Sequence, residues 1–153
     1  MSNLVYFVVI ILIFYIILLE FKYNTYMSFI QGFWISDPSF CEESNIQDMI
    51  FFIDNQNKTM KILIQQEDKN LENTTYDMKL CKILNSNNFT INSDCMEYKL
   101  KLTEHEKNNK KNNIMDGDYT LYLSLSKGII TLYKDDMVYA ILYKDNMMSS
   151  KLL

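Results

Sequence analysis

The sequence predicts an all-β domain, an antiparallel meander that forms a small barrel or a sandwich, preceded by one N-terminal transmembrane helix. Three observations lead to this fold class. An uncharged apolar block occupies residues 4–19, almost at the start of the sequence. Beyond it, apolar and polar residues alternate with a period of two, which is the period of a half-buried strand. Short runs of Asn, Asp and Gly separate these segments and are typical of tight turns between antiparallel strands.

The apolar block predicts a membrane anchor over residues 1–24. A helix over residues 4–19 would be roughly 24 Å long, and the uncharged and aromatic residues at its ends extend it toward the roughly 30 Å of a bilayer core. A cleavable signal peptide is the main alternative, but it normally has a basic stretch before the apolar core and small residues at its cleavage site. The sequence has neither, which favours a retained anchor. Lys22 favours the cytosol for the following domain, and the orientation stays open.

Residues 25–153 are predicted to form one β domain. The clearest alternation lies in residues 96–103, whose apolar side chains would face a core while the charged ones face water. About nine strands in roughly 120 residues is the density of a sandwich or a small barrel. Residues 104–118 are polar and lack periodicity, so they are predicted to be a surface loop. The predicted strands are 27–36, 47–54, 59–65, 75–84, 89–93, 96–103, 119–126, 129–134 and 137–144.

The composition argues against nucleic-acid binding. All 15 basic residues are Lys, and 19 Asp and Glu residues bring the net charge to −4. The chain therefore lacks the guanidinium groups that bind phosphates and base edges through two parallel hydrogen bonds. It also lacks the positive charge that a polyanion-binding domain concentrates on one face.

No catalytic set, cofactor site or metal site stands out, and we expect no enzymatic activity. His105 lies in the polar loop, where an imidazole would not be held rigidly against a nucleophile, so a hydrolase that pairs a Cys with His105 is the least favoured hypothesis. Cys41, Cys81 and Cys95 lack the spacing of a zinc site. Cys81 with Cys95 is the disulfide to test first if the domain faces an oxidising compartment. Free, unremarkable thiols are the favoured interpretation.

Three Asn residues are candidate N-glycosylation sites. Asn57, Asn73 and Asn88 each begin an Asn-X-Thr triplet, and each lies at a predicted turn or strand start. The triplets matter only if the domain is lumenal. In so Asn-rich a chain, occurrence by chance is the alternative.

The tripeptide Gly32-Phe33-Trp34 lies in the first predicted strand. A Gly-X-Trp element followed by a β-meander is similar to the lipocalin and fatty-acid-binding-protein pattern. The resemblance implies a barrel that binds an apolar small molecule, with Gly32 and Trp34 at the ligand site. These families often stack a basic residue over the Trp, commonly an Arg, which this chain lacks. The favoured alternative is that Trp34 is a core residue closing one end of the sheet.

The anchor, residues 29–53 and residues 138–149 together resemble uncharacterised small membrane-anchored proteins of nucleocytoplasmic large DNA viruses. The elements behind the resemblance are Gly32-Phe33-Trp34, Phe40-Cys41 and the strand 140–143, and the A+T-type composition fits such a genome. The resemblance implies a membrane location, such as a virion or host membrane, and no known activity. The leading hypothesis is a single-pass structural or interaction protein in contact with the lipid bilayer and with other membrane or capsid proteins. The alternative is a membrane-tethered, lipocalin-like binder of an apolar small molecule.

Overall fold

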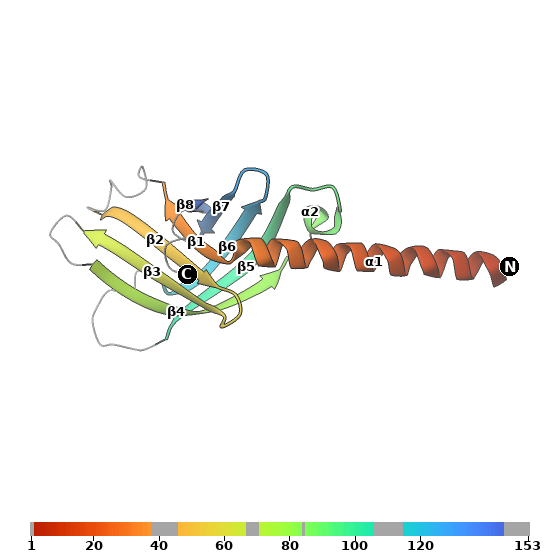
Figure 1. Cartoon of the computed structure of the whole chain (residues 1–153), viewed down its shortest axis with the longest axis horizontal. Coiled ribbons are helices and arrows are strands. Elements are labelled where there is room, and N and C mark those ends of the chain that lie inside the picture. Colours follow the sequence, from red (N-terminus) through yellow and green to blue (C-terminus); the bar gives the residue numbers. More distant parts are fainter. Residues whose placement is uncertain (1, 38–45, 67–70, 84, 106–114, 146–153) are drawn as a thin grey trace.

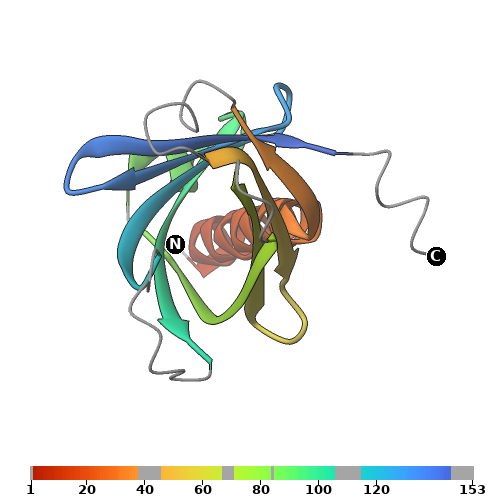
Figure 2. The same cartoon turned by 90° about the vertical axis from the view of Figure 1, so that its left-hand side faces the viewer.

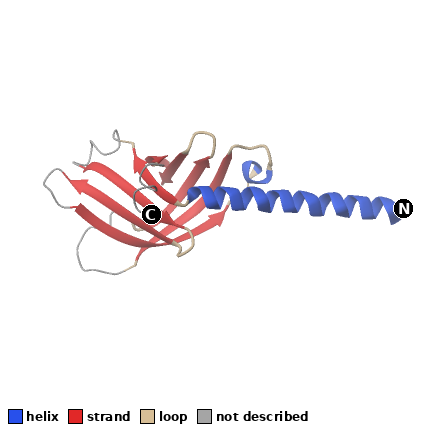
Figure 3. Cartoon of the chain, in the orientation of Figure 1, coloured by secondary structure: helices blue, strands red, loops and turns tan. Residues whose placement is uncertain are grey.

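A long N-terminal helix leads into a closed, eight-stranded antiparallel barrel (Figures 1 and 3). The computed structural model describes residues 2–37, 46–66, 71–83, 85–105 and 115–145. The prediction of an all-β domain after one apolar helix is confirmed, and the domain is a barrel. The elements are α1 (Ser2–Ile30), β1 (Gly32–Ser36), β2 (Ile46–Asp54), β3 (Thr59–Gln66), β4 (Leu71–Lys82), α2 (Ser86–Phe89), β5 (Cys95–Glu104), β6 (Gly117–Ser124), β7 (Ile129–Lys134) and β8 (Met137–Lys144).

The strands follow one another around the barrel in chain order. Each pairs antiparallel with the next, and β1 also pairs with β8, where Trp34 lies opposite Lys144. Tight turns join consecutive strands and so favour this order. The turn between β7 and β8 consists of Asp135 and Asp136, which have φ angles of 52° and 61°. Gly128 has a φ of 62° in the turn between β6 and β7. Such positive φ angles match the twist of a two-stranded hairpin.

The alternation of apolar residues fills the barrel interior. Along β5, Met96, Tyr98, Leu100 and Leu102 are buried, whereas Lys99 and the other residues between them lie on the outer face. The same alternation in β6 buries Tyr119, Leu121 and Leu123. The interior is therefore lined by side chains from every strand, as expected for a barrel of this size.

The C-terminal end of α1 closes one mouth of the barrel. Tyr26 and Ile30, one helical turn apart, are buried in the barrel core, and Tyr23, Met27 and Phe29 pack against it. Figure 2, which looks through the barrel, shows the helix nearly end-on within the ring of strands. We call this end the helix-side mouth. It is formed by the β2–β3 turn, the β4–β5 connection, the β6–β7 turn and the end of β8.

The structure differs from the sequence prediction in two strands. Residues 27–30, predicted as the start of the first strand, are the last turn of α1, because burying Tyr26 and Ile30 on one face requires the helical spacing of four. Residues 89–93, predicted as a strand, are not one. Ser86–Phe89 is a short helix, and β4 pairs directly with β5. In the polar loop, β6 already begins at Gly117 and Met115 is buried.

Candidate functional site

The first half of α1 exposes an apolar surface on all sides. The large hydrophobic side chains at residues 4–17 are all exposed, as Phe7, Ile10 and Phe14 illustrate. Among the described residues, Leu4–Ile30 is the one helix long and apolar enough to cross a membrane, with a mean hydropathy of 2.9. Soluble proteins rarely expose so large a continuous apolar patch, so this surface is a candidate contact site for lipid or protein.

Two side chains from the barrel cap the C-terminal end of α1. The last carbonyl groups of a helix have no partner within the helix. The indole Nε1 of Trp34 donates to the carbonyl oxygen of Ile30 at 2.8 Å, and the ammonium group of Lys144 donates to the carbonyls of Phe29 and Gln31. A cation at this position also interacts favourably with the helix dipole. The helix and the barrel are thus joined by hydrogen bonds as well as by packing.

Lys144 lies over two aromatic rings at this junction. Its Nζ atom is 4.8 Å from the ring centroid of Trp34 and 4.9 Å from that of Phe29, within the range of cation–π attraction. The chain has no Arg, and a Lys on the last strand stacks on the Trp. Gly32, with a φ of +116°, makes the turn from α1 into β1, a conformation that favours glycine.

The lowered pKa of Lys144 should make barrel stability depend on pH. Burial lowers the pKa of its ammonium group to about 8 from an ordinary value of 10.5. Between these values the unfolded chain binds more protons, so the free energy of unfolding rises as the pH increases. We compare the urea concentration at the unfolding midpoint of the wild type with that of Lys144→Met. The difference, wild type minus variant, should be larger at about pH 9.5 than at about pH 7.5. An equal difference at both pH values would contradict this assignment.

Asn88 organises the β4–β5 connection. Its Nδ2 atom donates to the carbonyl oxygens of Ile83 and Glu97, both at 2.7 Å, and its Oδ1 atom accepts from the backbone N–H of Glu97 at 2.9 Å. The side chain is buried. A glycan on Nδ2 would disrupt these bonds, so the fold does not suit Asn88 as a glycosylation site. The other two candidates, Asn57 and Asn73, are exposed.

Replacing Asn88 should destabilise the barrel through unpaired backbone groups. We expect Asn88→Ala to lower the free energy of unfolding by about 2–4 kcal/mol, because three buried backbone bonds lose their partner. Asn57→Ala is the matched control, since the exposed Asn57 bonds only at a surface turn, and it should change stability by less than about 0.5 kcal/mol. Urea unfolding in detergent measures both values, and similar losses would argue against a structural role for Asn88.

The β4–β5 connection lies along α1 and is bonded to it (Figure 1). Three side chains of α1 donate to backbone carbonyl oxygens of the connection: Tyr15 to Phe89, Lys22 to Thr90 at 2.6 Å, and Tyr26 to Ser93 at 3.1 Å. The three donors are spaced by seven and four residues, so they lie on one face of the helix. Beside them, Lys82 forms an ion pair with Glu20 at 3.7 Å and lies 3.8 Å from the ring centroid of Tyr23. These contacts fix the connection against the middle of the helix.

A cleft of about 530 Å³ lies between α1 and the barrel wall, and we call it the helix cleft. Most of its wall is apolar, and Lys and Asn side chains contribute the rest. The lining residues are Tyr23, Met27, Asn55, Lys58, Met78, Lys79 and Leu80. Neither Gly32 nor Trp34 lines it, so the predicted ligand-binding role of these two residues stays a prediction.

A second hollow of about 520 Å³ lies on the outer face of β4 to β7, and we call it the outer groove. Lys79, Lys99 and Lys101 line it together with Asp118, Asp135 and Asp136. Lys101 lies directly opposite Asp118 in the β5–β6 ladder. The groove thus presents both signs of charge beside the ring of Tyr133, and it is also not lined by Gly32 or Trp34.

The candidate disulfide between Cys81 and Cys95 is not formed. Cys81 and Cys95 are free thiols. In the sheet, Cys81 lies opposite Lys99, four residues along β5 from Cys95, which separates the two cysteines by roughly 13 Å. Disulfides need Cα atoms within about 7 Å. Cys41 lies outside the described residues.

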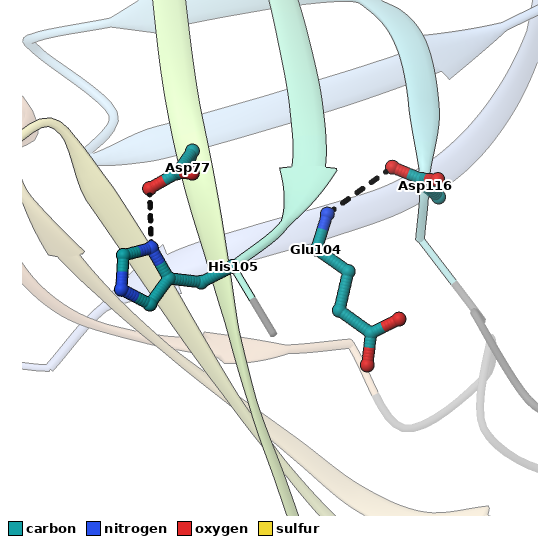
Figure 4. A network of polar contacts seen from close by, with 4 residues as sticks. All are labelled: Asp77, Glu104, His105 and Asp116. Atoms are coloured by element: carbon teal, nitrogen blue, oxygen red, sulfur yellow. Dashed lines mark hydrogen bonds and ion pairs between the residues drawn. The ribbon is translucent and has the colours of Figure 1, made fainter. Parts of the chain in front are cut away.

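His105, just after the end of β5, bonds the carboxylate of Asp77 on β4 (Figure 4). Its Nδ1 atom is 2.8 Å from Oδ1 of Asp77, and both side chains are more than half exposed. Next to this pair, the backbone N–H of Glu104 donates to Asp116 at 3.3 Å. Cys81 lies four residues further along β4 than Asp77, roughly 13 Å away, so its thiol is not within hydrogen-bond reach of the imidazole. The arrangement is an exposed hydrogen-bonded pair, with no nucleophile brought to it by the described residues.

Comparison of the chain with protein-family models, with curated proteins and with solved structures gave no match. The fold and its contacts therefore carry the functional argument. The sequence reasoning missed Lys144, Asn88 and the bonded face of α1. Only the last had a usable signal, because Tyr15, Lys22 and Tyr26 place polar atoms on one face of α1.

Proposed function

We propose that this chain is a single-pass membrane protein whose β-barrel is a structural or interaction module at the bilayer surface, without enzymatic activity. One observation carries the proposal. The helix that exposes an uninterrupted apolar surface at residues 4–17 buries its last turns in the barrel core. A helix inserted in lipid would therefore hold the barrel directly at the membrane.

The outer groove is the surface that best suits a protein partner. It places three Lys and three Asp around Tyr133 on the side of the barrel. Such mixed charge selects a partner with a complementary arrangement of both signs. The resemblance to membrane-anchored proteins of large DNA viruses supports a viral or host membrane as the location and other membrane or capsid proteins as the partners.

The helix cleft supports a second candidate function, a membrane-tethered, lipocalin-like binder of an apolar small molecule. Its volume suits a small ligand, and Met27, Met78 and Leu80 give it an apolar wall.

Membrane fractionation tests the leading proposal. The full chain should stay with membranes through alkaline carbonate washing and be released by detergent. Protease protection of the barrel in sealed membranes shows on which side of the membrane the barrel lies. Release by carbonate alone would contradict it.

For the second candidate, delipidated protein should bind a fluorescent fatty acid and lose this binding in Leu80→Glu but not in Met137→Glu. Equal binding by the two variants would exclude the helix cleft.

A further inference from the structure

The β4–β5 connection carries apolar side chains beside the apolar half of α1. Phe89 is 49% exposed and Ile91 is 36% exposed, although most apolar side chains of the barrel strands face inward. The hydroxyl of Tyr15 donates to the carbonyl of Phe89, which places this residue at the level of the exposed helix surface. The two apolar surfaces are therefore adjacent.

The part of α1 that precedes the connection is shorter than the hydrocarbon core of a bilayer. Residues 2–14, which precede the first bond to the connection, would span only about 20 Å of the roughly 30 Å of hydrocarbon. The first charged residue of α1 is Glu20, five residues and about 7.5 Å beyond Tyr15. A bilayer that covers the uncharged part of α1 therefore reaches past the level of Phe89.

Three backbone carbonyl groups of the connection have side-chain partners on α1, which suits a weakly hydrated environment. Carbonyl groups near lipid need internal partners, because no water replaces a missing hydrogen bond there. The carbonyls of Phe89, Thr90 and Ser93 accept from side chains of α1. The amide of Asn88 bonds backbone groups on both flanks of the connection.

We propose that residues 85–93 enter the interface of the lipid bilayer, with Phe89 and Ile91 among the upper acyl chains, so that the helix-side mouth of the barrel faces the membrane. This inference rests on the proposed membrane anchor and goes beyond it, because a tether alone would leave the orientation of the barrel open. The connection acts as a second membrane contact beside α1. The partner is lipid, because the apolar patch is continuous with the helix surface.

Tryptophan quenching by brominated lipids tests the depth of the connection. Three full-length variants, Phe14→Trp, Phe89→Trp and Met137→Trp, are placed in phosphatidylcholine vesicles brominated either near the headgroup or deep in the acyl chain. Met137 is exposed at the opposite mouth and serves as the matched control. Trp34 is common to all variants, so its emission in the wild type is subtracted. Far-UV circular dichroism checks that each barrel is folded.

We expect Phe14→Trp to lose most of its added emission with the deep bromines and Phe89→Trp to lose most of it with the shallow ones. Met137→Trp should be unaffected by either lipid. Quenching of Phe14→Trp without quenching of Phe89→Trp would overturn the inference and leave the anchor in place. If neither Phe14→Trp nor Phe89→Trp is quenched and no protein binds to the vesicles, the proposed membrane anchor itself is wrong.

Discussion

Replacement of Trp34 with Ala should lower the free energy of unfolding by about 3–5 kcal/mol, the usual cost of truncating a large buried aromatic side chain. Trp34 has no exposed surface, donates to Ile30 at the end of α1, and lies beneath Lys144. Its loss would leave a cavity, an uncapped carbonyl group and a displaced ammonium group at one point. Single domains are stable by about 5–15 kcal/mol, so this is a large part of the total.

Phe33→Ala is the matched control for Trp34→Ala. Phe33 is the preceding residue on β1 but lies on the outer face, where its ring packs on Phe52 with the centroids 4.7 Å apart. We expect this change to cost about 1 kcal/mol, because the side chain is only half-buried. Pulse proteolysis in detergent compares the two without relying on tryptophan emission. A loss for Trp34→Ala no greater than that for Phe33→Ala would contradict the capping role.

Two lysines in the middle of α1 should release the protein from membranes. Ile10→Lys combined with Ile13→Lys would place two charges near the bilayer centre, each costing about 2.5–3.5 kcal/mol on insertion scales. Both side chains are exposed, so the barrel should keep its stability. The double change to Leu at the same positions is the control. Carbonate extraction measures the result, and equal retention of both double variants would show that the helix does not lie in lipid.

The sequence was most informative where a residue pattern has one physical solution. Alternation in residues 96–103 can bury one face only as a strand, and β5 is that strand. Turns at Gly128 and at Asp135–Asp136 joined the last three strands as predicted, because these residues tolerate positive φ angles. The exposed apolar stretch of α1 followed from the same kind of evidence, since it has no polar face to bury.

The two mistaken strand predictions share a cause in long-range contacts. Residues 27–30 contain apolar residues that suit a strand or a helix, and their packing inside the barrel decides for the helix. Residues 89–93 alternate weakly, but Asn88 bonds the backbone and holds the connection in another conformation. Neither contact is visible in the local sequence.

Of the candidate site, only the exposed apolar helix was predicted from the sequence. The ligand-binding role of Gly32 and Trp34 stays a prediction. Their partner Lys144 was missed because it is more than a hundred positions away and stacks on Trp34 only where β8 closes the barrel against β1. The sequence also could not decide whether Cys81 and Cys95 lie close enough to pair. Their separation depends on the β4–β5 register, which sequence spacing does not give.

The junction between helix and barrel contains almost no linker. Gln31 alone separates Ile30 from the first residue of β1. The capping bonds from Trp34 and Lys144 restrict rotation of the helix relative to the barrel. A change in the tilt of α1 would therefore change the orientation of the whole barrel by the same angle. In the proposed membrane-spanning state, bilayer thickness would set that tilt and so determine which wall of the barrel neighbouring molecules meet.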